Sequence, residues 1–323
     1  VTYYSSKTKD QTVNTTVAPS SGYTGLLTNV GETQSNGWEI TAHVTPVRTS
    51  KFEFTIGGNY TYLHNTVVSL YQGAPLALAT YGGTTGSWAY EGKSFPVVTG
   101  FDYRRDASGR VIVDPITGMP SQNSDSLVIF GQAQPKTRIG IDGSLKYKGL
   151  TLSFLLEYRG GSVIYNAGGS TFDWSGTGIR TVTFNRDRFV FPNSSYWDDS
   201  KQQYVPNKDI TLKDGNGNAG FWSDGGGNMN VNANYVTSAD FWKLREVAIS
   251  YDFPDRLFGN KKTIKGVTVS VQGRNLLVLL PKDNIYTDPE YSDAGYNSNG
   301  IGLTGLGQTP PSRFYGATVT FKF

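Results

Sequence analysis

Hydrophobic and polar residues alternate along this chain in about eight separate segments. The last segment is the clearest, because Tyr315, Ala317, Val319, Phe321 and Phe323 form one apolar face and the residues between them are small or polar. Successive side chains of a β-strand point to opposite faces, so this spacing predicts a strand with one apolar and one polar side. Similar alternation occurs at residues 38–45, 52–62, 139–147, 150–159, 242–253 and 267–272.

One of these segments changes phase part-way along. Val247, Ile249 and Tyr251 share a face that Trp242 and Leu244 do not. An extra residue in one strand produces such a shift. The pattern therefore predicts a β-bulge near Arg245.

The connections between the segments alternate between short and long. Short ones lie at residues 48–50, 148–149 and 254–263, and long ones at about 11–34, 69–134, 162–240 and 278–311. In an up-and-down meander, alternate connections lie at opposite ends of the strands. Short turns at one end and long loops at the other are typical of transmembrane β-barrels.

Aromatic residues gather at both ends of the expected strands if the chain ends on the periplasmic side. Those at the extracellular ends are Trp38, Tyr60, Tyr62, Tyr158, Trp242 and Tyr315. Those at the periplasmic ends are Phe52, Phe54, Tyr147, Tyr251, Phe253 and Phe323. Two aromatic girdles of this kind mark the interfaces of a bilayer, which favours a membrane barrel over a water-soluble sandwich or propeller.

The long loops also bear on the size of the barrel. Eight strands can close by themselves, but the interior of such a barrel is nearly filled by side chains. The loops make up well over half of this chain, so one sector of a larger barrel fits better. The apolar faces would contact lipid, and the Thr, Ser, Glu and Arg faces would line a wet interior.

Composition supports an all-β class. The 323 residues include 39 Gly and 20 Tyr, with 37% hydrophobic and 17% charged residues. Cysteine is absent, which excludes disulfides and thiolate chemistry. A net charge of +3 with scattered basic residues argues against nucleic acid as a partner. Val1 enters a strand-like pattern directly, without a visible signal peptide, so the chain is expected to begin inside a longer protein.

Catalytic chemistry has little support in the sequence, and no catalytic residue, cofactor or metal is expected. His43 and His64 lie on different segments. Glu157, Glu246 and Glu290 could pair for glycoside hydrolysis, yet acidic residues are ordinary inside barrels. Asp214, Asn216 and Asn218 resemble the start of a calcium loop, but Ala219 replaces its turn glycine and Gly225 stands where its bidentate glutamate belongs.

Aromatic residues in the long loops are the candidate substrate-binding set. They lie among Gly, Asn and Asp, and such surroundings suit stacking on sugars or gripping of peptide side chains. The alternative is that they pack the loops together or against a partner protein. The residues are Trp88, Tyr90, Trp174, Tyr196, Trp197, Phe221 and Trp222.

Several motifs resemble the SusC/RagA family of TonB-dependent outer-membrane transporters of Bacteroidetes. The stretch Asn29-Val30-Gly31-Glu32, followed by Asn36-Gly37-Trp38-Glu39, resembles the family's "NVGE…NKGxE" return. Residues 241–254 resemble "FLRLKNVTLGYxxP", and residues 271–276 resemble "VSGQNLF". Phe323 resembles the aromatic signal read by the barrel-assembly machinery. Ser35-Asn36 carries no lysine and Trp242 replaces a common leucine, which leaves the subfamily open.

The resemblance implies a barrel of 22 strands with an amino-terminal plug, and it places residues 1–323 over about the last eight strands. The plug, the TonB box and the earlier strands would lie outside this sequence. It further implies import of a bulky nutrient, an oligosaccharide or a peptide, driven by the TonB-ExbB-ExbD complex beneath a SusD-like surface lipoprotein. A passive porin or a structural barrel scaffold is the alternative, and an outer-membrane enzyme ranks third.

Overall fold

The computed structural model describes most of the chain. The described residues are 1–15, 26–82, 84–212, 219–223, 228–254, 257, 263–291, 300–307, 309 and 311–323. The calcium-like stretch Asp214 to Asn218 lies outside them.

A large antiparallel sheet of eight strands dominates the fold. Every neighbouring pair runs antiparallel. The all-β antiparallel class expected from the alternation is therefore confirmed. In spatial order the strands are β1 (Thr2–Thr15), β2 (Leu26–Arg48), β3 (Phe52–Ser69), β9 (Thr137–Tyr147), β10 (Leu150–Gly160), β15 (Phe241–Asp252), β16 (Gly266–Leu279) and β18 (Phe314–Lys322).

The first hairpin is longer than the sequence predicts. Residues 11–34 were expected to form a loop, but β1 continues to Thr15 and β2 begins at Leu26, with Thr15 paired to Leu26. Residues 11–15 and 26–34 are mostly polar in sequence, so they carry no period-two signal. Backbone hydrogen bonds hold the two strands together whatever their side chains are. The pattern of hydrophobic and polar residues therefore did not predict this extension.

The apolar residues of the large sheet line up in rows on one face. Tyr60, Ile139, Tyr158, Trp242 and Leu279 are register partners on five adjacent strands. A second row on the same strands contains Phe52, Tyr147, Leu150, Tyr251 and Val269. Eight residues separate the rows on β3, β9 and β10, and the bulges add one on β15 and two on β16. Eight residues span about 27 Å along a strand, which a tilt of about 40° reduces to about 20 Å.

This spacing is close to the apolar band of a membrane barrel, which is about 25 Å tall. Tyr315 does not lie in the extracellular girdle where the sequence placed it. It pairs with Gly273 and lies in register between the two rows. The face between the rows is exposed, with Ile249 at 51% and Val271 at 57%. A continuous apolar surface of this size needs a membrane or a partner to cover it.

The bulge expected near Arg245 is present. The register between β10 and β15 shifts at Leu155/Leu156, and that between β15 and β16 shifts between Leu244 and Glu246. The extra residue places Val247 and Ile249 on the apolar face between the two rows and directs Arg245 and Glu246 to the polar face.

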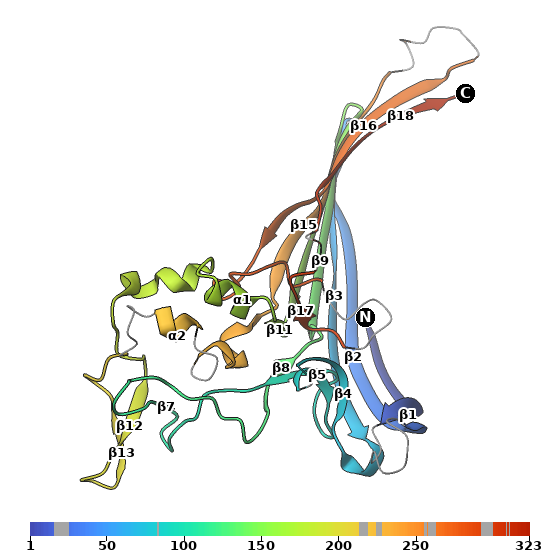
Figure 1. Ribbon diagram of the computed structural model, residues 1–323. Coiled ribbons are helices and arrows are strands. Elements are labelled where there is room, and N and C mark those ends of the chain that lie inside the picture. The colour runs from blue at the N-terminus through green and yellow to red at the C-terminus, as the bar shows by residue number, and fades with distance from the viewer. Residues whose placement is uncertain are drawn as a thin grey trace.

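All three long connections that the structure describes lie at one end of the sheet, and the short turns lie at the other (Figure 1). The loops carry small sheets of their own. These are β4 (Leu76–Tyr81), β5 (Thr85–Ala89), β6 (Val97–Gly100) and β8 (Val128–Gln132); β7 (Val111–Ile112), β12 (Ser194–Asp198) and β13 (Gln203–Pro206); and β11 (Val163–Asn166), β14 (Val236–Ser238) and β17 (Leu303–Thr304). Two short helices, α1 (Gly169–Trp174) and α2 (Ala219–Ser223), lie beside them (Figure 1).

The buried core lies in these loops. One cluster joins Val98, Ala133, Tyr165, Tyr235 and Leu303, which come from all three long connections. Gly302 permits this packing, because its φ of +88° is a conformation that suits glycine and a Cβ there would approach Ala133 within 2.5 Å. The long loops are thus a packed layer at one end of the sheet.

Candidate functional site

The polar face of the sheet contains a groove of about 440 Å³. Its lining includes Arg138, Glu157, Arg159 and Arg245 from the strands, and Glu290 from the connection between β16 and β18. The groove therefore brings strand residues and a loop residue together.

Six charged side chains form one network at this groove. Arg159 and Arg245 both bind Glu157 and Glu290, and Lys243 binds Asp288 and Glu290. The Arg159 guanidinium lies 2.7 Å from Glu157 and 3.0 Å from Glu290, and the Lys243 Nζ lies 2.6 Å from Asp288. Three cations face three anions, so the network is neutral overall.

The bulge in β15 explains how this network forms. It places Arg245 on the polar face beside Lys243, where the two side chains reach the same carboxylate. Phe241 lies beneath them, with the charges of Lys243 and Arg245 at 5.0 and 5.8 Å from its ring. Cations above an aromatic face gain further electrostatic stabilisation.

Glu290 is held ionised by its partners. Partial burial would raise the pKa of its carboxyl, but hydrogen bonds from Arg245 and Lys243 and their positive charges lower that pKa to about 2. The network therefore attaches the segment around residues 288–290 to the wall of the sheet.

These contacts do not favour glycoside hydrolysis by Glu157, Glu246 and Glu290. A glycosidase needs one carboxylic acid whose pKa is raised, so that it can protonate the leaving group. The pKa of Glu290 is lowered instead. Glu157 is bound by two arginines, and Glu246 lies 2.8 Å from Arg274.

The two histidines have different hydrogen-bond partners and do not contact each other. His43 Nε2 lies 3.2 Å from both carboxylate oxygens of Asp142, and His64 contacts Thr66. Within the described residues no three His, Cys, Asp or Glu side chains group as metal ligands.

The structure disperses the aromatic residues proposed for substrate binding. Trp88 and Tyr90 lie together near β5, with ring centroids 6.2 Å apart. Trp174 is 62% exposed on α1. Tyr196 and Trp197 lie on β12, where Trp197 packs edge-on against Tyr204 of β13.

Phe221 and Trp222 of α2 are packed inside the loop layer. They are 3% and 9% exposed, and they join Phe189 and Leu212 in a second core cluster. For these two residues the structure favours the packing alternative. Phe323 is 73% exposed beyond β18, and its role in assembly stays a prediction.

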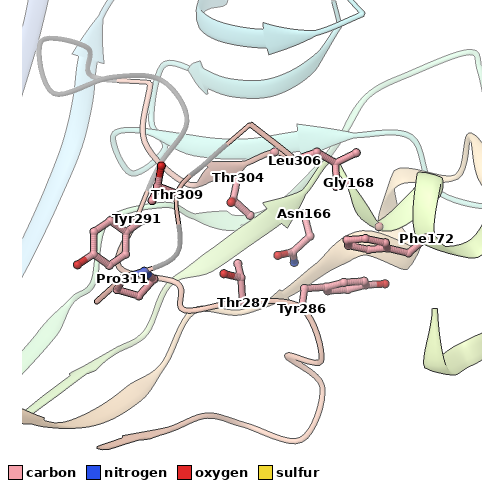
Figure 2. A pocket seen from close by; sticks show the side chains of 12 residues that line it. Asn166, Gly168, Phe172, Tyr286, Thr287, Tyr291, Thr304, Leu306, Thr309 and Pro311 are labelled. Atoms are coloured by element: carbon pink, nitrogen blue, oxygen red, sulfur yellow. The ribbon is translucent and has the colours of Figure 1, made fainter. Parts of the chain in front are cut away.

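A smaller pocket of about 170 Å³ lies within the loop layer (Figure 2). Phe172 of α1, Tyr286 and Tyr291 supply its rings, and Asn166 of β11 lies between them. The sequence analysis did not select these residues, although Phe172, Tyr286 and Tyr291 also stand among Gly, Asn and Asp. That shared composition was the signal that could have found them.

The sequence of this chain is similar to those of known proteins. No family model matches it. The chain is 27% identical over 307 residues to TonB-dependent receptor P26 of Formosa agariphila, and 24% identical over 306 residues to TonB-dependent receptor P39 of the same organism. These alignments cover 89% and 79% of the chain. The homologues of this chain are TonB-dependent receptors.

Solved structures agree on the fold. The RagAB peptide transporter superimposes with a TM-score of 0.68 at 19% identity, covering 99% of this chain and 32% of that one. The RagAB peptide importer in its "open-open" state gives a TM-score of 0.66 at 18% identity. These similar proteins are receptors and transporters, and the chain is accordingly not assigned an enzyme activity.

The chain spans less than a third of the length of these TonB-dependent receptors, at 29% of P26 and 27% of P39. In the described part of the chain, no helix has the length and hydrophobicity needed to cross a bilayer.

Proposed function

We propose that this chain forms part of the wall and the outer loops of a TonB-dependent transporter, which imports a bulky nutrient across the bacterial outer membrane. The observation that carries this proposal is the sheet itself. It has one exposed apolar face bounded by two aromatic rows and all of its long described loops at one end, and its homologues are TonB-dependent receptors.

In this proposal the eight strands are the last of a 22-stranded barrel. The apolar face contacts lipid and the polar face lines the interior, where a plug encoded outside residues 1–323 would lie. The likeness to RagAB over 99% of the chain supports this placement. TonB with ExbB and ExbD would act on segments outside this sequence, and the barrel-assembly machinery would insert the protein.

The loop layer would lie outside the cell and contact both the substrate and a SusD-like lipoprotein. The packed core of the loops supports this role, because a rigid loop layer can present a binding surface at little entropic cost. The substrate is an oligosaccharide or a peptide.

The test is energy-dependent uptake by cells that carry the full-length gene. A mixture of fluorescently labelled neutral oligosaccharides and 8- to 12-residue peptides is supplied, and accumulation is compared with that in a gene deletion, in a tonB deletion and after protonophore treatment. We expect wild-type cells to accumulate one of the two classes of compound. In the tonB deletion and after protonophore treatment, that accumulation should fall to the level of the gene deletion. Uptake that persists without TonB would instead identify a passive porin.

The partner is tested separately by affinity purification of the full-length protein from outer membranes solubilised in mild detergent. We expect a surface lipoprotein of the SusD type at a stoichiometric level. A photo-crosslinking residue at exposed Trp197 of the loop layer should capture it, whereas one at Val271 on the apolar face should not.

A further inference from the structure

The pocket in the loop layer is built from three segments that are distant in sequence. Asn166 and Phe172 come from β11 and α1, Tyr286 and Tyr291 from the connection after β16, and Thr304 from β17. Figure 2 shows Phe172 and Tyr286 at one end and Tyr291 at the other, with the polar side chains between them. The segments meet only through the tertiary fold.

The polar floor of the pocket has an unused hydrogen-bond acceptor. Asn166 is 2% exposed, and its Nδ2 donates to the Tyr235 carbonyl at 3.0 Å and to Thr237 Oγ1 at 3.1 Å. A carbonyl can only accept, so these bonds fix which end of the amide is nitrogen. The Oδ1 atom has no hydrogen-bond partner, and a buried acceptor left unpaired is costly.

The aromatic side chains are positioned to contact a ligand. Phe172 is 38% exposed, and Tyr286 and Tyr291 are half-buried. Thr287 and Thr309 add hydroxyl groups to the lining, and among the described lining residues none is charged. A neutral ligand with both an apolar surface and hydroxyl groups matches this composition.

The helix α1, which carries Phe172, contacts Arg180 on the side away from the pocket. Asp173, which follows Phe172 on α1, is almost fully buried, and Arg180 lies 3.5 Å from its carboxylate and donates to the Asn234 carbonyl at 2.9 Å. Burial raises the pKa of Asp173, and the charge of Arg180 opposes that shift. This contact links α1 to Arg180 and, through it, to the Asn234 carbonyl behind the pocket.

The volume of the pocket suits one ring of a larger ligand. An engineered cavity of about 150 Å³ binds benzene, so about 170 Å³ accommodates one six-membered ring. A purely apolar ring would leave the Asn166 Oδ1 without a hydrogen-bond donor. A sugar ring instead presents C–H faces to the aromatic side chains and hydroxyl donors to the acceptor.

We propose that this pocket is a subsite for one neutral sugar ring of a glycan. The proposal deepens the transport function and rests on it, because it names a glycan as the imported substrate. It also assigns to Phe172, Thr287 and Asn166 a contact role that the dispersed loop aromatics do not share.

The experiment measures binding to the purified full-length protein by calorimetry. The probes are cellohexaose, laminarihexaose, mannohexaose and xylohexaose, with an equimolar mixture of uncharged 10-residue peptides as the competing class. The variants are Phe172→Ala, which removes one ring, and Thr287→Val, which removes one hydroxyl at nearly constant shape. Ile179→Ala is the matched control, since it is 65% exposed on the same loop and does not line the pocket.

We expect at least one hexasaccharide to bind, with affinity reduced about tenfold by Phe172→Ala and about fivefold by Thr287→Val. The control should change affinity less than about twofold. Binding of the peptides with no sugar bound, or sugar binding that both pocket variants leave unchanged, would overturn the subsite. TonB-dependent uptake in either of those cases would show that the transport function stands while the subsite does not.

Discussion

At the scale of single residues, the charged network around Arg245 is the most consequential feature of the polar face. The side chain of Lys243 is only 3% exposed, and its ammonium group pairs with Asp288 and Glu290. Burying a charge is tolerated when it is paired and hydrogen-bonded, and it becomes costly when a partner is removed. The network thus makes the position of the β16–β18 connection depend on a few side chains.

Glu290→Gln should destabilise the folded protein by about 2 kcal/mol, because it removes the carboxylate shared by Lys243 and Arg245 while Asp288 and Glu157 remain. The measurement is urea-induced unfolding of the full-length protein in lipid vesicles. Glu246→Gln is the control, since its pair with Arg274 is largely exposed and should contribute less than about 1 kcal/mol. Equal losses in the two variants would contradict the importance given to the network.

The same carboxyl predicts a dependence on pH. The pKa of Glu290 is lowered from 4.5 to about 2 in the folded protein, so its ionised form stabilises the fold. That contribution is complete above about pH 4.5 and is lost as the pH falls toward 2. The difference in unfolding free energy between the wild type and Glu290→Gln should therefore be constant from pH 7 to 5 and shrink below 4.5. A difference that grows on acidification would refute this assignment.

At the scale of elements, each strand has an apolar and a polar face because hydrophobic and polar residues alternate along it. The bulge in β15 keeps the apolar residues on the same face along the whole strand. Leu152 on the apolar face registers with Ile249, and Ser153 beside it points to the polar face. The proposed membrane contact makes these neighbours behave differently, although they are adjacent in sequence.

Leu152→Arg should cost about 1 to 3 kcal/mol of folding free energy in a bilayer, because a charge would enter the lipid between the aromatic row at Leu150 and the midplane. Ser153→Arg should cost less than about 1 kcal/mol, because the polar face is hydrated. Refolding titrations into vesicles of fixed thickness measure both. If the two variants are equally stable, the assignment of faces is wrong.

At the scale of the whole molecule, the large sheet is open in the described structure. The strands β1 and β18 stand at its two edges in the strand order, and each is paired on one side only (Figure 1). In a bilayer, unpaired backbone groups at a sheet edge are unfavourable, so both edges need a partner strand, which the proposed 22-stranded barrel supplies.

Residues 1–323 expressed alone should accordingly fail to insert as a stable barrel. On a cold denaturing gel the isolated segment should migrate as an unfolded chain, whereas the full-length protein should show the faster migration of a folded barrel that is lost on boiling. A heat-sensitive fast band from residues 1–323 alone would indicate a small closed barrel and would reopen the porin alternative.

The sequence by itself determined the strands, their faces, the bulge near Arg245 and the alternation of short and long connections. These features are local, since a period of two and a change of phase can be read within a dozen residues. It did not reveal the extension of the first hairpin, because polar strands carry no alternation.

Only the tertiary structure decided which loop residues come together. Asn166, Phe172 and Tyr286 meet across more than a hundred positions of sequence, and Glu157, Arg245 and Glu290 do so as well. Phe221 and Trp222 looked like Trp174 in the sequence but proved to be buried. Burial and contact between distant segments depend on how the loops pack, and no local pattern encodes that packing.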